Sequence, residues 1–167
     1  MKKWIFVLGL VFGTTPLFAN QPFYAGSGVG GLVVESDNFV AGGAGFNVFA
    51  GYRVNEYLNA EIQFMTASSL EDEPASISPQ FITSSITAHT PISSNFNLYG
   101  RVGIAYWQAD ITLGQRSELD SSGTDITLGA GFELQYSRKI ILRQEYQYVQ
   151  MKDGGSQSLG FQFVYQF

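Results

Sequence analysis

The chain has no cysteine and only one histidine, His89, among its 167 residues. Without cysteine there is no disulfide framework and no thiol chemistry, and with a single histidine a metal site would have to be built from carboxylates. Charged residues make up 14% of the chain, which is low against about 25% in ordinary soluble domains. The formal net charge of −5 argues against the basic surface that nucleic-acid binding needs. We therefore expect no cofactor, no bound metal and no nucleic-acid partner.

Long apolar runs are also missing. After the first twenty residues no run of about 18 apolar residues occurs, so no transmembrane helix is expected there. The first stretch, MKKWIFVLGLVFGTTPLFAN, starts with two lysines, continues with a short apolar run and reaches a small residue, Ala19. This layout is typical of a secretory signal peptide, whereas a membrane anchor is disfavoured because Gly13 and Pro16 interrupt the run. We predict a signal peptide over residues 1–19 and an exported domain over residues 20–167.

The sequence is rich in residues that favour strands. Aromatic residues reach 15% and glycines number 19, a mixture that favours strands over helices. Alternation of apolar and polar or small residues recurs along the chain. Most of the alternating segments are close to the length of about 9–11 residues that a tilted strand needs to cross a bilayer. Eight segments show this pattern: 23–34, 40–54, 58–66, 80–90, 96–108, 125–136, 140–149 and 157–167.

The connections between these segments differ in length in a regular way. Residues 55–56, 91–95 and 137–139 are tight turns, whereas residues 65–79 and 109–123 are longer and polar. Short turns on one rim and longer loops on the other are the arrangement of outer-membrane barrels. We predict an all-β fold, an eight-stranded antiparallel up-and-down transmembrane β-barrel whose ends both lie at the short-turn rim. The two long loops are candidates for binding extracellular ligands.

Alternation alone leaves open which face is buried, because a soluble lipocalin-like barrel also alternates. In the last segment the apolar face is the more aromatic one, and the other face carries mainly serine, glycine and glutamine with few charges, unlike a water-facing surface. Small and neutral polar side chains fit the inside of a narrow barrel. Tyrosines near the expected strand ends suit an interfacial girdle: Tyr52, Tyr57, Tyr106, Tyr136, Tyr146, Tyr148 and Tyr165. The pattern favours a barrel with lipid outside.

Several stretches resemble the transmembrane domain of the OmpA family. FAGYRVNEYLNAEIQF is similar to its second hairpin, PISSNFNLYGRVGIAYWQAD to its third short turn and strand, GFELQYSRKIILRQEYQY to its last periplasmic hairpin, and SLGFQFVYQF to its closing strand. The resemblance covers nearly all of the exported part. Because the chain stops at Phe167, no peptidoglycan-binding domain or cell-wall tether is inferred, and its size resembles the small, barrel-only OmpX-like members.

The resemblance implies an outer-membrane protein of a Gram-negative bacterium with both termini in the periplasm. It also implies that the terminal Phe167, with Tyr165 and Phe163 on the same face, resembles the signal read by the barrel-assembly machinery. The expected partners are this machinery, the outer-membrane lipid and lipopolysaccharide, and extracellular ligands at the long loops. We expect a monomer.

A set of charged residues lies on the face that would point into the barrel. By parity these residues are Arg53, Glu61, Arg101, Glu133, Arg143 and Glu145. A lone buried charge is costly, whereas opposed charges with additional hydrogen bonds offset much of that cost. One hypothesis is therefore an ion-pair network that fills and orders the interior. The other is a gate, in which alternative pairings open or close a water path.

The OmpA-family resemblance bears on the gate hypothesis. In that family a lumenal Glu–Arg pair is thought to act as a gate; Glu61 and Arg143 match its two positions, and Glu133 matches a third member of the cluster. The family's lumenal lysine falls on Thr87 here, which leaves Arg101 as the nearest substitute for a second cationic partner.

An enzymatic role is the remote alternative. Lipid-modifying barrels need a serine, a histidine and usually an acid within hydrogen-bonding reach. His89 has Ser93 and Ser94 nearby in sequence, but no acid is evident and the position is at the expected periplasmic end, so His89 is interpreted as a polar rim residue. The acidic run 70–74 could hold a divalent cation loosely but is better explained as a solvated loop. GSGVGG, residues 26–31, is interpreted as a glycine-rich strand and not a phosphate loop, since no helix follows.

These observations give the predicted function. We expect a structural or surface-interaction barrel with a narrow, ion-pair-filled lumen, since eight strands enclose a space that side chains just fill. The second hypothesis is a small, low-conductance pore gated by the lumenal Glu–Arg network. No catalytic residue is assigned.

Overall fold

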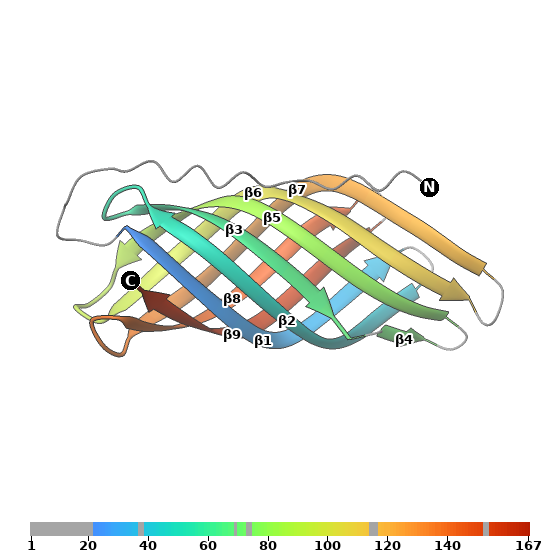
Figure 1. Ribbon diagram of the computed structural model, residues 1–167, viewed down its shortest axis with the longest axis horizontal. Helices are drawn as coiled ribbons and strands as arrows, with labels where there is room; N and C mark the ends of the chain where they lie inside the picture. Colours follow the sequence, from blue (N-terminus) through green and yellow to red (C-terminus); the bar gives the residue numbers. More distant parts are fainter. Residues whose placement is uncertain (1–21, 37–38, 69, 73–74, 114–116, 152–153) are drawn as a thin grey trace.

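A computed structural model of the chain describes residues 22–36, 39–68, 70–72, 75–113, 117–151 and 154–167 (Figure 1). The predicted signal peptide lies outside the described residues. None of the described residues belongs to a helix long and apolar enough to cross a membrane. The strands are β1 Phe23–Ser36, β2 Phe39–Arg53, β3 Leu58–Ala67, β4 Leu70–Asp72, β5 Ala75–Pro91, β6 Phe96–Leu113, β7 Ser117–Gln135, β8 Ile140–Met151 and β9 Gly154–Gln166.

Within the described residues, eight strands, all except the three-residue β4, form one closed antiparallel barrel. Each strand pairs with its neighbours in sequence, β1 pairs with β9, and β3 pairs with β5 to complete the ring. Closure leaves the wall of the barrel without an edge strand, which is the condition for a sheet to survive in hydrocarbon. The predicted eight-stranded up-and-down barrel is confirmed.

Three tight turns connect strands at one end of the barrel, and they share one hydrogen-bonding scheme. In each turn two successive backbone N–H groups donate to the same carbonyl: those of Val54 and Asn55 to Leu58, at 2.9 and 3.1 Å. Ile92 and Ser93 repeat the scheme with Phe96, and Tyr136 and Ser137 repeat it with Ile140. The described ends of the chain meet at the same rim (Figure 1), where the N–H of Phe167 donates to the carbonyl of Phe23.

The other end differs from the prediction, because much of the two expected long loops is strand. β6 and β7 continue as a hairpin as far as the Leu113–Ser117 pair, and β4 pairs with residues 75–77 of β5. The alternation signal fades there because beyond the membrane both faces of a strand meet water. Backbone pairing needs no apolar face, so the ladder continues past the point where the sequence pattern stops.

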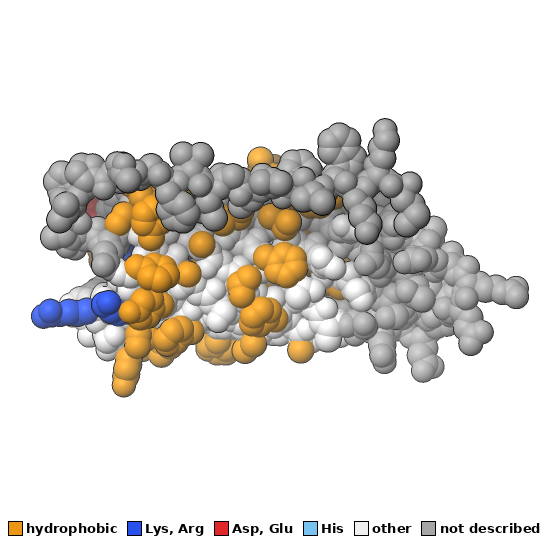
Figure 2. Space-filling model, in the orientation of Figure 1, with side chains coloured by type: hydrophobic (Ala, Val, Ile, Leu, Met, Phe, Trp, Pro, Cys, Tyr) orange, Lys and Arg blue, Asp and Glu red, His pale blue; other side chains and the backbone are white. Residues whose placement is uncertain are grey.

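Side chains alternate between the wall and the lumen along every long strand. On β9, Phe161 and Phe163 are 64% and 47% exposed, whereas Gln162 and Val164 between and beyond them are 5% and 1% exposed. Figure 2 shows hydrophobic side chains spread over the visible wall, as the lipid-outside arrangement requires. A soluble barrel would place these groups inside.

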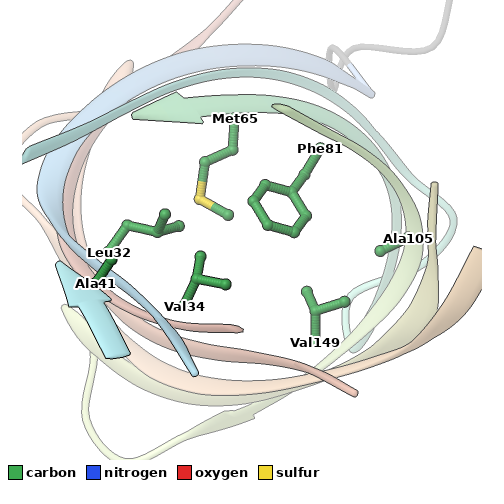
Figure 3. Close-up of a cluster of buried hydrophobic side chains, with 7 residues drawn as sticks. All are labelled: Leu32, Val34, Ala41, Met65, Phe81, Ala105 and Val149. Carbon is green, nitrogen blue, oxygen red and sulfur yellow. The ribbon is translucent and has the colours of Figure 1, made fainter. Parts of the chain in front are cut away.

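The lumen has apolar layers on both sides of a polar one. Towards the long-strand end, Leu32, Met65 and Phe81 point into the interior and are buried together with neighbours from other strands (Figure 3). Towards the tight-turn end, a smaller cluster joins Tyr24 and Phe49 with two aliphatic side chains of β8 and β9. Five of the six charged residues of the sequence analysis, all except Arg53, lie between these layers.

Inward-facing aromatic rings lie over glycines on the neighbouring strand. Tyr24 is opposite Gly51 in the β1–β2 ladder, and Tyr99 is opposite Gly131 in the β6–β7 ladder. A Cβ atom added at Gly51 would overlap the Tyr24 ring. Glycine is therefore required at these positions because a large ring occupies the space that a side chain would fill, as in the rescue of strand glycines by aromatic neighbours.

Gly51→Ala is expected to destabilise the barrel by about 1–3 kcal/mol, the usual cost of overpacking, because the Tyr24 ring must move. The matched control is Gly31→Ala on β1, where an added Cβ has no atom within 4 Å, and no loss is expected. Urea-induced unfolding in lipid vesicles compares the two. Equal unfolding free energies for both variants would contradict the packing account.

Candidate functional site: a charged network inside the barrel

Five of the six predicted lumenal charges converge in the polar layer. Each is between 2% and 5% exposed, and they come from four strands. They are Glu61 on β3, Arg101 on β6, Glu133 on β7, and Arg143 and Glu145 on β8. The barrel brings them together because each sits at an inward-facing position of its own strand.

Glu61 is the centre of this network. Its carboxylate accepts a hydrogen bond from Arg101 and lies 2.9 Å from Nη1 of Arg143. The hydroxyl of Tyr24 donates to the same carboxylate at 2.5 Å. These three donors offset the cost of removing the charge of the Glu61 carboxylate from water. An unpaired carboxylate in this position would destabilise the fold.

Arg143 joins Glu61 to a second carboxylate. Its Nε and Nη2 donate to Oε1 of Glu133 at 2.9 and 2.6 Å. The guanidinium also lies 4.8 Å from the ring centre of Tyr99 and 5.1 Å from that of Phe49, so aromatic faces fill positions not taken by carboxylates. Cation–π contacts of this kind are favourable for a desolvated arginine.

Arg101 makes the corresponding link on the other side. Its Nη2 lies 3.1 Å from Oε2 of Glu145 in addition to its bond with Glu61. Nη1 of Arg101 donates to the side-chain oxygen of Gln63 at 2.9 Å, and the hydroxyl of Tyr99 donates to Glu145. Each guanidinium is thus shared between two carboxylates.

His89 extends the network towards the tight-turn end. Its Nδ1 lies 3.2 Å from Glu133, its Nε2 lies 2.9 Å from Oγ1 of Thr87 and from Nδ2 of Asn59, and its ring stacks on Tyr99. The ion pairs therefore form a chain of alternating sign, which runs through Glu145, Arg101, Glu61, Arg143 and Glu133. His89 contacts the Glu133 end of this chain. His89 lies at the tight-turn end, as expected, and lines the recess there. Its side chain is only 8% exposed, and its contact with Glu133 was not predicted. No serine occurs among these contacts of His89.

Arg53 does not join the chain of ion pairs that the structure describes. It lines a recess of about 550 Å³ at the tight-turn end, together with Asn59, His89 and Glu133. With the Gln166 amide oriented to satisfy its neighbours, the Gln166 oxygen accepts a hydrogen bond from Nη2 of Arg53 at 2.5 Å. Arg53 therefore lies at the rim of the lumen, outside the buried layer.

Four uncharged or unassigned residues of the network were missed by the sequence analysis: Tyr24, Gln63, Tyr99 and His89. The signal that finds them is the same parity that found the charges. His89 shares its face with Thr83 and Thr87, and Tyr99 shares its face with Arg101. Parity shows which residues face the lumen. It does not show which of them pair with one another, because that depends on the stagger between strands, the barrel shear.

Two other expectations concern cation binding and phosphate binding. Among the residues that the structure describes, no group of three His, Cys, Asp or Glu side chains could hold a metal ion. The acidic run 70–74 lies partly outside the described residues, so its cation hypothesis stays a prediction. The glycine-rich segment 26–31 lies within β1, as interpreted from the sequence.

The chain is similar to known outer-membrane proteins. A family model described as outer membrane protein beta-barrel domain matches residues 5–167. Outer membrane protein A of Klebsiella aerogenes is 28% identical over 109 residues, which is 63% of this chain and only 31% of that protein, so less than a third of that relative's length is matched.

Solved structures share the fold. Neisserial surface protein A superimposes with a TM-score of 0.75 at 21% identity, covering 87% of this chain and 97% of that chain. Ail, the attachment invasion locus protein of Yersinia pestis, gives a TM-score of 0.68 at 17% identity with the same coverage of 87% and 97%. The N-terminal β-barrel domain of Pseudomonas aeruginosa OprF gives 0.65 at 12% identity, covering 87% of this chain and 99% of that chain.

Glu61→Ala is expected to lower the free energy of unfolding by about 3–5 kcal/mol, the cost of leaving buried partners of a charge unpaired. Glu61→Gln, which keeps an acceptor for one donor, should lose less. The control is Glu56→Ala in the exposed turn after β2, expected within about 0.5 kcal/mol of the wild type. Urea unfolding of the refolded barrel measures all three. A loss for Glu61→Ala no larger than that for Glu56→Ala would show that the network does not stabilise the fold.

Proposed function

Because the chain belongs to the outer membrane protein β-barrel domain family, and so is an outer-membrane barrel of a Gram-negative bacterium, we propose that it acts as a structural and surface-interaction protein. The observation that carries this proposal is the filled lumen. A protein whose interior is occupied by paired charges and packed apolar side chains offers its outer end, and not its interior, to other molecules.

Two layers of side chains, one polar and one apolar, fill the lumen. They support the proposal that no wide water path runs through the barrel. In the polar layer each guanidinium is held between two carboxylates. In the apolar layer Leu32, Met65 and Phe81 are 1–4% exposed. A cavity of about 10 Å³ beside Asn47, Gln63 and Glu145 is about the volume of a single water probe. An eight-stranded barrel has an interior that side chains just fill.

The sheet extension at the long-strand end supports surface interaction. β7 begins at Ser117, whereas its pairing with β8 begins only at Thr127. Within the described residues, one backbone edge of positions 117–126 therefore has no strand paired with it. An extended segment of another protein can add to such an edge through main-chain hydrogen bonds. The related fold of Ail, named for attachment and invasion, is consistent with this role.

The expected partners fit the same proposal. Phe163, Tyr165 and Phe167 are 47%, 38% and 53% exposed on the outer wall, where barrel-assembly machinery can contact them during insertion. Outer-membrane lipid and lipopolysaccharide surround the wall, extracellular ligands meet the sheet extension, and the closed barrel needs no second copy to satisfy its backbone. We therefore propose a monomer.

A gated small pore is the second candidate, and one observation favours it. Arg101 contacts both Glu61 and Glu145, and Arg143 contacts both Glu61 and Glu133. A cation that already has two partners can move towards one of them without becoming unpaired. Such a rearrangement would still have to displace the apolar layer around Phe81 before ions could pass.

Planar bilayer recordings of the refolded protein separate the two functions. We expect a heat-modifiable gel shift, which reports folding, and no stable openings. Arg143→Ala, with Arg138→Ala as the control for loss of one exposed cation, should remain silent if the apolar layer closes the lumen. Stable openings of the wild type would contradict the structural proposal, and openings that increase only in Arg143→Ala would favour the gated pore.

A further inference from the structure

A cationic side chain contacts the outer wall at the tight-turn end. Lys139 is the last residue of the turn before β8, and the following Ile140 pairs with Tyr165 of β9. Nζ of Lys139 lies 3.3 Å from the hydroxyl of Tyr165 and 5.5 Å from the centre of its ring. The side chain of Lys139 is exposed to solvent, and these contacts place its ammonium beside Tyr165 on the outer wall. Figure 2 shows basic side chains protruding at this end beside the hydrophobic wall.

The wall next to this lysine is hollowed. A depression of about 520 Å³ extends over β2, β1, β9, β8 and β7 and is lined almost entirely by apolar atoms. One row of its lining is Leu142, Phe163 and Ser27, which are cross-strand partners. The next row includes Phe132, Phe161 and Phe46. Ser27 is small among bulky neighbours, and the missing side-chain volume at this position helps to form the hollow.

The lysine and the hollow are in register with each other. The Ile140–Tyr165 pair beside Lys139 is followed two residues later by the Leu142–Phe163 pair that begins the hollow. Two residues of strand span about 7 Å. A glycerol backbone separates the phosphate of a phospholipid from the start of its acyl chains by a comparable length. The order of the surface, a cation near the water and a hydrocarbon hollow deeper in the membrane, is the order of groups in a lipid.

We propose that an anionic phospholipid of the periplasmic leaflet binds at this place, with its phosphate on Lys139 and Tyr165 and one acyl chain in the hollow. Charge complementarity selects an anionic head group, because the ammonium of Lys139 brings a positive charge to the wall beside Tyr165. The acyl chain fits because the hollow is apolar and faces the hydrocarbon region. The site rests on the membrane location of the barrel and is independent of whether the lumen conducts.

Native mass spectrometry of the refolded barrel, equilibrated with dioleoylphosphatidylglycerol or with dioleoylphosphatidylcholine, tests the site. We expect one phosphatidylglycerol to be retained in preference to phosphatidylcholine. Lys139→Gln should weaken retention about fivefold, the size expected for one basic side chain at an anionic lipid surface. Arg138→Gln removes the same charge from the neighbouring turn residue, which makes no contact with Tyr165 among the described interactions, and should change little.

A second pair of variants tests the hollow. Ser27→Leu fills it with an apolar side chain that suits a lipid-facing position, and should reduce retention of phosphatidylglycerol. Ser84→Leu makes the same change on the exposed face of β5, away from the hollow, and should have no effect. The proposal is overturned if both lipids are retained equally, if Lys139→Gln and Arg138→Gln weaken retention equally, or if Ser27→Leu binds as the wild type does.

Discussion

The structure depends on one constraint: in hydrocarbon every backbone N–H and C=O group must be paired within the protein. A sheet meets this constraint only by closing on itself. Here eight long strands form the ring, and the pairing of β3 with β5 completes it. Eight strands fix a narrow interior. Every inward-facing side chain must then either pack or pair with the few others that it can reach, and the layered lumen follows from this.

The network of ion pairs inside the barrel disfavours strands that pair in the wrong register. A strand that slips by one residue turns its whole inward face to the lipid. A slip of β8 would expose Arg143 and Glu145 to hydrocarbon and would leave Glu61 and Glu133 without a shared cation. The network therefore penalises wrong registers more strongly than apolar side chains do. This supports a role in specifying the fold, whatever further role the site has in the assembled membrane.

The two ends of the barrel divide the remaining tasks. The tight-turn end is short, with polar side chains such as Arg53 and His89 around its recess. The long-strand end carries the apolar layer inside and the β6–β7 extension outside. Any exchange between periplasm and exterior through the lumen would have to pass both layers, whereas interaction with an extended partner needs only the backbone edge of β7.

Much of this could be predicted from the sequence, because period-2 alternation places residues such as Glu61 and Arg143 in the lumen without knowledge of their partners. The pairings could not be predicted, since they depend on the stagger between strands: Glu61 meets both Arg101 and Arg143. The contact of His89 with Glu133 was not predicted, because nearness to a turn was weighted above the parity that turns His89 towards the lumen. The strand ends at Leu113 and Ser117 were missed because no apolar face marks strands outside the membrane.

The account depends most on the claim that the lumenal guanidinium groups are paired and shielded from water. Nitrogen-15 NMR of the refolded barrel can measure proton exchange of the arginine side chains individually. The guanidinium protons of Arg101 and Arg143 should exchange with water far more slowly than those of the exposed Arg138. Exchange of Arg101 and Arg143 at the rate of Arg138 would show that the interior is open and hydrated, and would contradict the account.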